Sequence, residues 1–272
     1  MTSSRKGISR PLSPARKAAL ELLRHAGRVP SLAMARTLNV AEIALARQEG
    51  ESPPSWQAVF LRAYGLLSRL HPELRRALIQ WPRQRLYEHP CSVCLLPIER
   101  DCLGESAALP ATIREPENLS LDAIDRRIEH YREAPLWEVL PCRQMLRLGR
   151  LPGLLRRFHA WRSLHVSGCR RAERFGTFVL SSLGPQGVEQ FHPLSPLTTH
   201  FTFGPVAANG ELTAQIVYDP RVLDGRCATH RLMDLEQVLH EDILPELRAL
   251  PAAASPSAGP AARRRTEVNK PR

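Results

Sequence analysis

The chain has little that would place it in a membrane, export it or hold it together covalently. Its 272 residues contain no run of about 18 apolar residues, so no transmembrane helix is expected. The basic N-terminus is followed by no apolar stretch of the kind found in secretion signals. Six cysteines are scattered through a chain long enough to bury a substantial core, which favours reduced thiols and a cytoplasmic location.

Motifs of several function classes are also missing. The sequence has no internal repeat and no Gly-rich phosphate loop of either common pattern. Cys91 and Cys94 have the spacing of a zinc or redox half-site, but no second pair of ligands has matching spacing. We therefore expect two buried thiols and no metal.

The net charge of +11 is compatible with a nucleic acid, an anionic surface or an anionic small molecule as partner. However, both ends of the chain are basic, and the interior has no dense Lys/Arg stripe interleaved with aromatic residues. The charge is interpreted as a solvated surface plus two basic tails, and no nucleic-acid partner is expected.

Composition divides the chain into a disordered basic N-terminus (1–13), one domain (14–250) and a disordered basic C-terminal tail (251–272). Within the domain, proline and glycine break residues 135–170 into short amphipathic pieces rich in Leu and Arg. We interpret them as a helical insertion or cover over the main body. The alternative, that 146–162 lies on a membrane or partner surface, stays open.

Apolar periodicity indicates a mixture of helices and strands. Helices are expected near 14–25, 41–48, 55–70, 118–132 and 227–250, with a helical turn at 72–77. Strands are expected at 32–40, within 86–98, at 112–113, 175–183, 199–206 and 211–218, with a tight turn at 209–210. Because helices and strands are mixed and the strands cluster late, the pattern favours a mixed α/β sandwich over a doubly wound parallel sheet.

The run Y-D-P-R-V-L-D-G at 218–225 joins the last strand to the last helix. It carries two carboxylates, Asp219 and Asp224, and ends on Gly225. Such strand-to-helix corners are common sites of chemistry, because a rigid strand aims the side chains.

This corner resembles the D-H-R-V-x-D-G signature of dihydrolipoyl acyltransferases, the catalytic domain of 2-oxoacid dehydrogenase complexes. Residues 176–184 (G-T-F-V-L-S-S-L-G) are similar to the family's G-T-F-T-I-S-S/N-L-G strand and turn. Further similar segments follow in the family's order at 15–18, 55–63, 71–74, 187–191 and 201–204. The resemblance therefore covers the chain from about residue 15 to 250.

The resemblance implies a mixed-sheet two-layer sandwich of the chloramphenicol acetyltransferase-like type, assembled as a homotrimer. It implies active sites at subunit interfaces, in a channel that coenzyme A enters from one side and the acyl acceptor from the other. Coenzyme A or acyl-coenzyme A would be a substrate, with no tightly bound cofactor. No lipoyl domain is expected in this chain.

In that family a neutral His takes the proton of the attacking thiol and a hydroxyl stabilises the oxyanion. By position, the resemblance implies Ser181 as this hydroxyl and Asp224 as the residue that braces the site. It implies structural roles for Asp219, Arg221 and Gly225. From the residues alone, Ser181 is equally a strand serine bonded to nearby backbone, and Asp224 equally a helix cap.

Pro220 occupies the position of the general-base His, and it has no group that can accept a proton. Loss of a general base costs about 10²–10⁴-fold in rate. His200 and His230 are the histidines nearest in sequence that could substitute, with His192 a further candidate. Two hypotheses stay open: a coenzyme A-dependent acyltransferase of doubtful activity, and a non-catalytic scaffold or regulatory relative that keeps the fold and assembly.

Overall fold

The computed structural model describes residues 7–102, 104–182 and 187–251. The predicted tails therefore lie partly outside it, at 1–6 and 252–272. Over the ranges described, no helix is long and apolar enough to cross a membrane.

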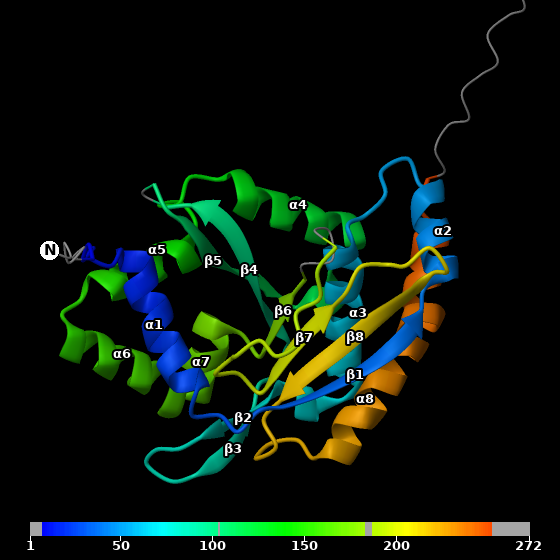
Figure 1. Ribbon diagram of the computed structural model, residues 1–272. Helices are drawn as coiled ribbons and strands as arrows, with labels where there is room; N and C mark the ends of the chain where they lie inside the picture. Colours follow the sequence, from blue (N-terminus) through cyan, green and yellow to red (C-terminus); the bar gives the residue numbers. More distant parts are fainter. Residues whose placement is uncertain (1–6, 103, 183–186, 252–272) are drawn as a thin grey trace, which may run out of the picture.

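Helices and strands follow one another along the whole chain (Figure 1). The helices are α1 (Pro14–Ala26), α2 (Ala41–Glu49), α3 (Trp56–Leu70), α4 (Leu121–Glu133), α5 (Leu140–Arg150), α6 (Gly153–His165), α7 (Gly168–Phe175), α8 (Gly225–Val238) and α9 (Leu244–Arg248). A π-helical turn, η4 (Leu239–Ile243), joins the last two, and η1 (Pro72–Arg75) and η2 (Pro116–Asn118) are 3-10 turns. The strands are β1 (Leu32–Asn39), β2 (Arg76–Ile79), β3 (Arg85–Glu88), β4 (Val93–Asp101), β5 (Ser106–Arg114), β6 (Phe178–Ser181), β7 (Thr199–Phe203) and β8 (Glu211–Tyr218).

Six strands form one mixed sheet in the order β1-β8-β7-β6-β4-β5. The central pairs β4–β6 and β6–β7 are parallel, and the pairs β1–β8, β7–β8 and β4–β5 are antiparallel. The mixed α/β class predicted from the sequence is confirmed. Strands β2 and β3 form a separate antiparallel hairpin.

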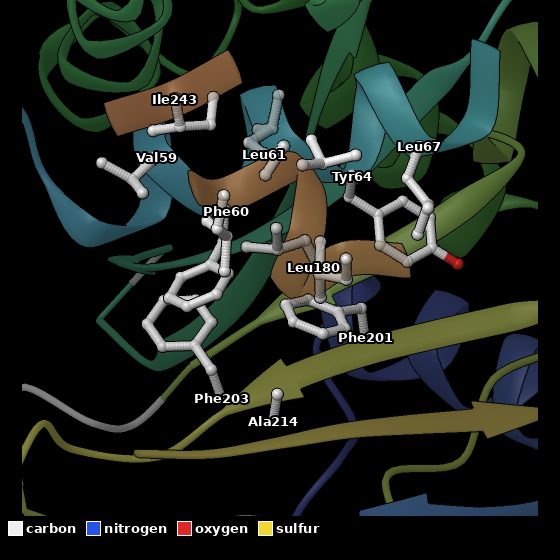
Figure 2. Close-up of a cluster of buried hydrophobic side chains, with 14 of the residues drawn as sticks. Val59, Phe60, Leu61, Tyr64, Leu67, Leu180, Phe201, Phe203, Ala214 and Ile243 are labelled. Atoms are coloured by element: carbon white, nitrogen blue, oxygen red, sulfur yellow. The ribbon is translucent and has the colours of Figure 1, made fainter. Parts of the chain in front are cut away.

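One face of the sheet is sealed by α3. Ser55 caps this helix by accepting a hydrogen bond from the Ala58 N–H, and Ala58 to Ser68 form an almost wholly buried stretch. Phe60 stacks on Phe203 with ring centroids 4.3 Å apart. Figure 2 shows these side chains, with Leu180 and Phe201, between the helix and the strands.

The helices lie in two groups on the sheet. Helices α3 and α8 pack together and share the apolar core with β6, β7 and β8. Helices α1, α5, α6 and α7 gather near β4 and β5, away from α8 (Figure 1). Residues 135–170 thus contain α5, α6 and the start of α7, which contact the sheet through β5 and β4.

Three local predictions are wrong in detail. The helical turn expected at 72–77 ends at Arg75, and Arg76 instead begins β2, because pairing with β3 overrides the local preference. The strand at 112–113 is part of the longer β5. The helix expected from 227 begins at Gly225, because Asp224 caps it there, and its later part passes through η4 before α9.

The two cysteines of the half-site differ in environment. Cys94 is fully buried in β4, whereas Cys91 precedes the strand and is only half-buried. The expectation of two buried thiols is therefore right only for Cys94.

We predict that Phe60→Ala lowers the free energy of unfolding by about 3–5 kcal/mol, because it leaves a cavity against Phe201 and Phe203. Leu70→Ala is the matched control, since Leu70 ends the same helix with its side chain 60% exposed. Urea denaturation of both variants measures the difference, and equal losses would contradict the assignment of α3 to the core.

Candidate functional site

The corner at 219–225 is held by an internal ion pair. Asp219 is 3% exposed, and its carboxylate accepts from Arg221 through Nε at 2.9 Å and an Nη nitrogen at 2.8 Å. The Arg221 backbone N–H donates to the same carboxylate at 3.0 Å. This pairing raises the pKa of the Arg221 guanidinium. Both charges are therefore used to shape the turn.

A buried cation lies near the same corner. Arg171 on α7 donates to the carbonyl oxygens of Leu78 at 3.0 Å and Pro196 at 2.7 Å. Burial lowers its pKa to about 10, while the charge of Asp219 acts in the opposite direction. Asp219 therefore lies in the field of two arginines.

Asp224 and Gly225 start α8. The Asp224 carboxylate accepts from the Cys227 N–H at 2.7 Å, the standard arrangement of an N-cap. A Cβ at Gly225 would lie only 3.2 Å from the Met34 side chain and 3.3 Å from the Tyr218 hydroxyl. The structure thus assigns Asp224 a capping contact, and glycine lets the helix begin close to β1 and β8.

Pro220 is exposed between these residues. His230 is an exposed residue of α8, and His192 bonds through Nε2 to the Ser31 hydroxyl at 2.9 Å. His71, which the sequence analysis did not consider, lies 3.2 Å from the Asp234 carboxylate. Among the residues that the structure describes, no hydrogen bond joins any of these imidazoles to Pro220.

Ser181, by contrast, lies directly against His200. The Ser181 Oγ is 2.8 Å from His200 Nε2 and donates to the Gln190 Oε1 at 3.0 Å. Because the hydroxyl proton goes to Gln190, Ser181 accepts from His200, and Nε2 is the nitrogen that carries hydrogen. His200 Nδ1 is buried and has no hydrogen-bond partner over the described ranges.

His200 is uncharged. It is 6% exposed in the middle of the sheet, and burial lowers its pKa to about 3. A charged imidazole would have to give up its water shell there without a carboxylate partner, which explains the direction of the shift. The pair is therefore a neutral imidazole bonded to a serine hydroxyl.

A polar network surrounds the pair on the face of the sheet opposite α3. The Thr202 hydroxyl bonds to the Gln190 carbonyl oxygen and the Gln215 Oε1, both at 3.4 Å. The Gln215 amide donates to the Phe191 carbonyl oxygen. Sequence reasoning missed Gln190, Thr202 and Gln215, although a glutamine inside the apolar run of β8 was a usable signal.

Within one chain, Ser181 and the corner lie at opposite ends of β7. Ser181 pairs with Thr202, and Thr202 pairs with Gln215 on β8. Pro220 follows Gln215 by five residues, which is roughly 17 Å along a strand. The structure therefore brings together Ser181 and His200, and it does not bring Ser181 to Asp224 or His230.

Metal chemistry finds no support in the described residues, which contain no group of three or more His, Cys, Asp or Glu side chains placed to hold an ion. The site can instead orient a serine hydroxyl within a network of neutral hydrogen-bonding groups on the sheet face opposite α3.

We predict that acid destabilises the protein through His200. Its pKa in the folded state, about 3, lies below the unfolded value near 6.5, so the unfolded chain binds more protons as pH falls below 6.5. Lowering the pH from 7 to 5 should cost about 2 kcal/mol through this residue. Urea denaturation at both pH values should show a smaller loss for His200→Gln and an unchanged loss for the exposed His230→Gln. An equal pH dependence in all three proteins would show that His200 is not buried and neutral.

The chain resembles known proteins in its three-dimensional structure. No protein-family model matches the chain, and no curated protein matches it. Solved structures do match. A probable dihydrolipoamide acetyltransferase from Listeria monocytogenes is 14% identical over 86% of this chain and 94% of that chain, with a TM-score of 0.60.

The dihydrolipoamide acetyltransferase of Azotobacter vinelandii is 18% identical over 89% of this chain and 94% of that chain, with a TM-score of 0.60. A truncated catalytic core of the 2-oxoacid dehydrogenase complex from Thermoplasma acidophilum is 13% identical over 87% and 99%, with a TM-score of 0.59. At these low identities the structural matches show a shared fold, and the predicted sandwich is confirmed. The chain has the fold of the dihydrolipoamide acetyltransferase catalytic core.

Proposed function

We propose that this chain is a non-catalytic domain of the acyltransferase fold, which keeps the assembly of its structural relatives and transfers acyl groups no faster than free thiols do. The observation that carries the proposal is Pro220 at the corner. Its ring has no titratable group, so the corner supplies no proton acceptor at that position.

The neighbouring carboxylates do not replace the missing base. Asp219 is bonded to Arg221 through both oxygens, and Asp224 caps α8. Both carboxylates are therefore already occupied by the contacts that shape the corner.

His200 is also a poor base for a thiol. Its pKa of about 3 lies some five units below that of the thiol, which makes the proton transfer uphill by about 7 kcal/mol. For an ordinary imidazole, the difference between its pKa and that of the thiol is only about two units. The hydrogen on Nε2 also occupies the nitrogen that faces Ser181. These contacts suit a residue that positions the Ser181 hydroxyl.

A second candidate function is acyl transfer with His200 as the substitute base. The 2.8 Å contact between Ser181 Oγ and His200 Nε2 favours it, because a nucleophile or oxyanion donor needs a partner at that distance. In this version the neutral imidazole carries its hydrogen on Nδ1 instead of Nε2, and Nε2 is free to accept the thiol proton.

The separation between Ser181 and the corner supports an assembly of several copies. Ser181 and the corner lie about five strand residues apart in one chain, so a site that combines them needs a second copy. One similar solved structure is described as the cubic core of the pyruvate dehydrogenase multienzyme complex. We therefore propose a cytoplasmic homotrimer, with the channel between copies as the place where an acyl-coenzyme A would bind.

The acyl-transfer prediction uses acetyl-coenzyme A and a small dithiol, with product followed by chromatography. The parent protein should match the protein-free rate, and Ser181→Ala should not change it. Pro220→His should raise the rate, because a general base contributes about 10²–10⁴-fold. A parent rate above background that His200→Ala abolishes would establish the second candidate instead.

The assembly prediction is a particle mass three times that of the 30.5 kDa chain, measured by light scattering after gel filtration. A monomer at all concentrations would contradict the homotrimer and leave the two halves of the site unconnected.

A further inference from the structure

A cavity of about 410 Å³ lies between α1, α5, α6, α7 and strands β4 and β5. Its floor includes Leu95 on β4 and Pro110 on β5. Leu95 pairs with Val179, and side chains alternate along a strand, so the cavity opens on the same sheet face as Ser181. Its walls come mainly from the helices of 140–175, and none of the corner residues line it.

The cavity is apolar over most of its wall. The apolar residues are Ala18, Leu22, Leu95, Pro110, Pro141, Met145, Leu148, Leu151, Ala160 and Phe175. Its volume lies in the range that holds small ligands, about 300–1,000 Å³. It therefore has room for a single acyl chain of medium length and not for a diacyl lipid.

Close packing of α1 on α5 gives the cavity a firm wall. A Cβ at Gly149 would overlap the Pro14 carbonyl group, so only glycine permits this approach. Cys142 anchors the other end of α5, where its thiol lies 3.5 Å from the Pro110 carbonyl oxygen. The space is thus part of the fold and not a gap between loose helices.

The polar groups of the wall are cationic or neutral. Arg147 and Arg174 are accompanied by Gln144, His159 and Ser163, and no carboxylate lines the cavity. Arg174 donates to the Ser163 hydroxyl at 2.8 Å, which fixes its guanidinium at the wall. Arg147 has no hydrogen bond or ion pair with any residue of the described ranges. Arg147 and Arg174 are both exposed, and neither has a carboxylate partner among the described residues. An apolar chamber with two such arginines at its rim is suited to an amphipathic anion.

We propose that this cavity binds a medium-chain carboxylate, with its alkyl chain among Leu22, Leu95 and Leu148 and its carboxylate against Arg147 and Arg174. A guanidinium matches the two oxygens of a carboxylate in plane, and the chain length is set by the volume. The helices α5, α6 and α7 then form a binding site that is separate from the corner. It holds whether or not the chain transfers acyl groups.

Calorimetric titration of the full chain with dodecanoate, below its micelle concentration, tests the proposal. One dodecanoate should bind per chain. Arg147→Ala should weaken binding about tenfold or more, because a charge-assisted hydrogen bond is lost. Arg150→Ala is the matched control: it lies on the same helix, is exposed, does not line the cavity, and should bind as the parent does.

Two further probes separate the head group from the tail. Dodecan-1-ol keeps the chain without the charge, and acetate keeps the charge without the chain, so both should bind at least tenfold more weakly than dodecanoate. Equal binding of dodecanoate to the parent and to Arg147→Ala, or no binding at all, would overturn the proposal. Tighter binding of dodecyl phosphate would overturn the carboxylate assignment. None of these readouts depends on acyl transfer, so this inference and the proposed function fail separately.

Discussion

The packing of α3 onto one face of the mixed sheet is the contact on which the rest of the molecule depends. Phe60 and Tyr64 lie against aromatic side chains from β6 and β7, and the Tyr64 hydroxyl donates to the Thr199 hydroxyl at 2.9 Å inside the core. Burial of so many large side chains is the main favourable term in folding. It also decides which face of each strand is apolar, and so where polar side chains can go.

Polar side chains of the central strands consequently gather on the other face. Side chains alternate along a strand. Because Phe201 and Phe203 face α3, His200 and Thr202 must face the other way. The same alternation places Ser181 and Gln215 beside them. The face opposite α3 thus carries two features of different origin. One is this hydrogen-bonded network, and the other is the cavity that α5, α6 and α7 enclose farther along the sheet.

The corner keeps its shape through contacts among its own residues. Asp219, Arg221, Asp224 and Gly225 each have a structural task that would be needed in any protein with this strand-to-helix turn. None of those tasks needs an imidazole at position 220. A proline there is compatible with the turn, because its backbone N–H is not required. The shape of the corner therefore does not depend on a titratable side chain at position 220.

Sequence alone determined the elements whose signals are local. The caps at Ser13, Ser55 and Ser120, the period of α3 and the alternation of β8 follow from neighbouring residues. The order of the motifs predicted the fold by resemblance, and the sequence shows Pro220 directly. Tertiary structure decided the rest, because pairing and burial join residues distant in sequence. Strand register placed Ser181 beside His200 and far from the corner, and burial set the charge of His200. The β2–β3 hairpin and the cavity beneath α5 and α6 likewise exist only through contacts that no local pattern records.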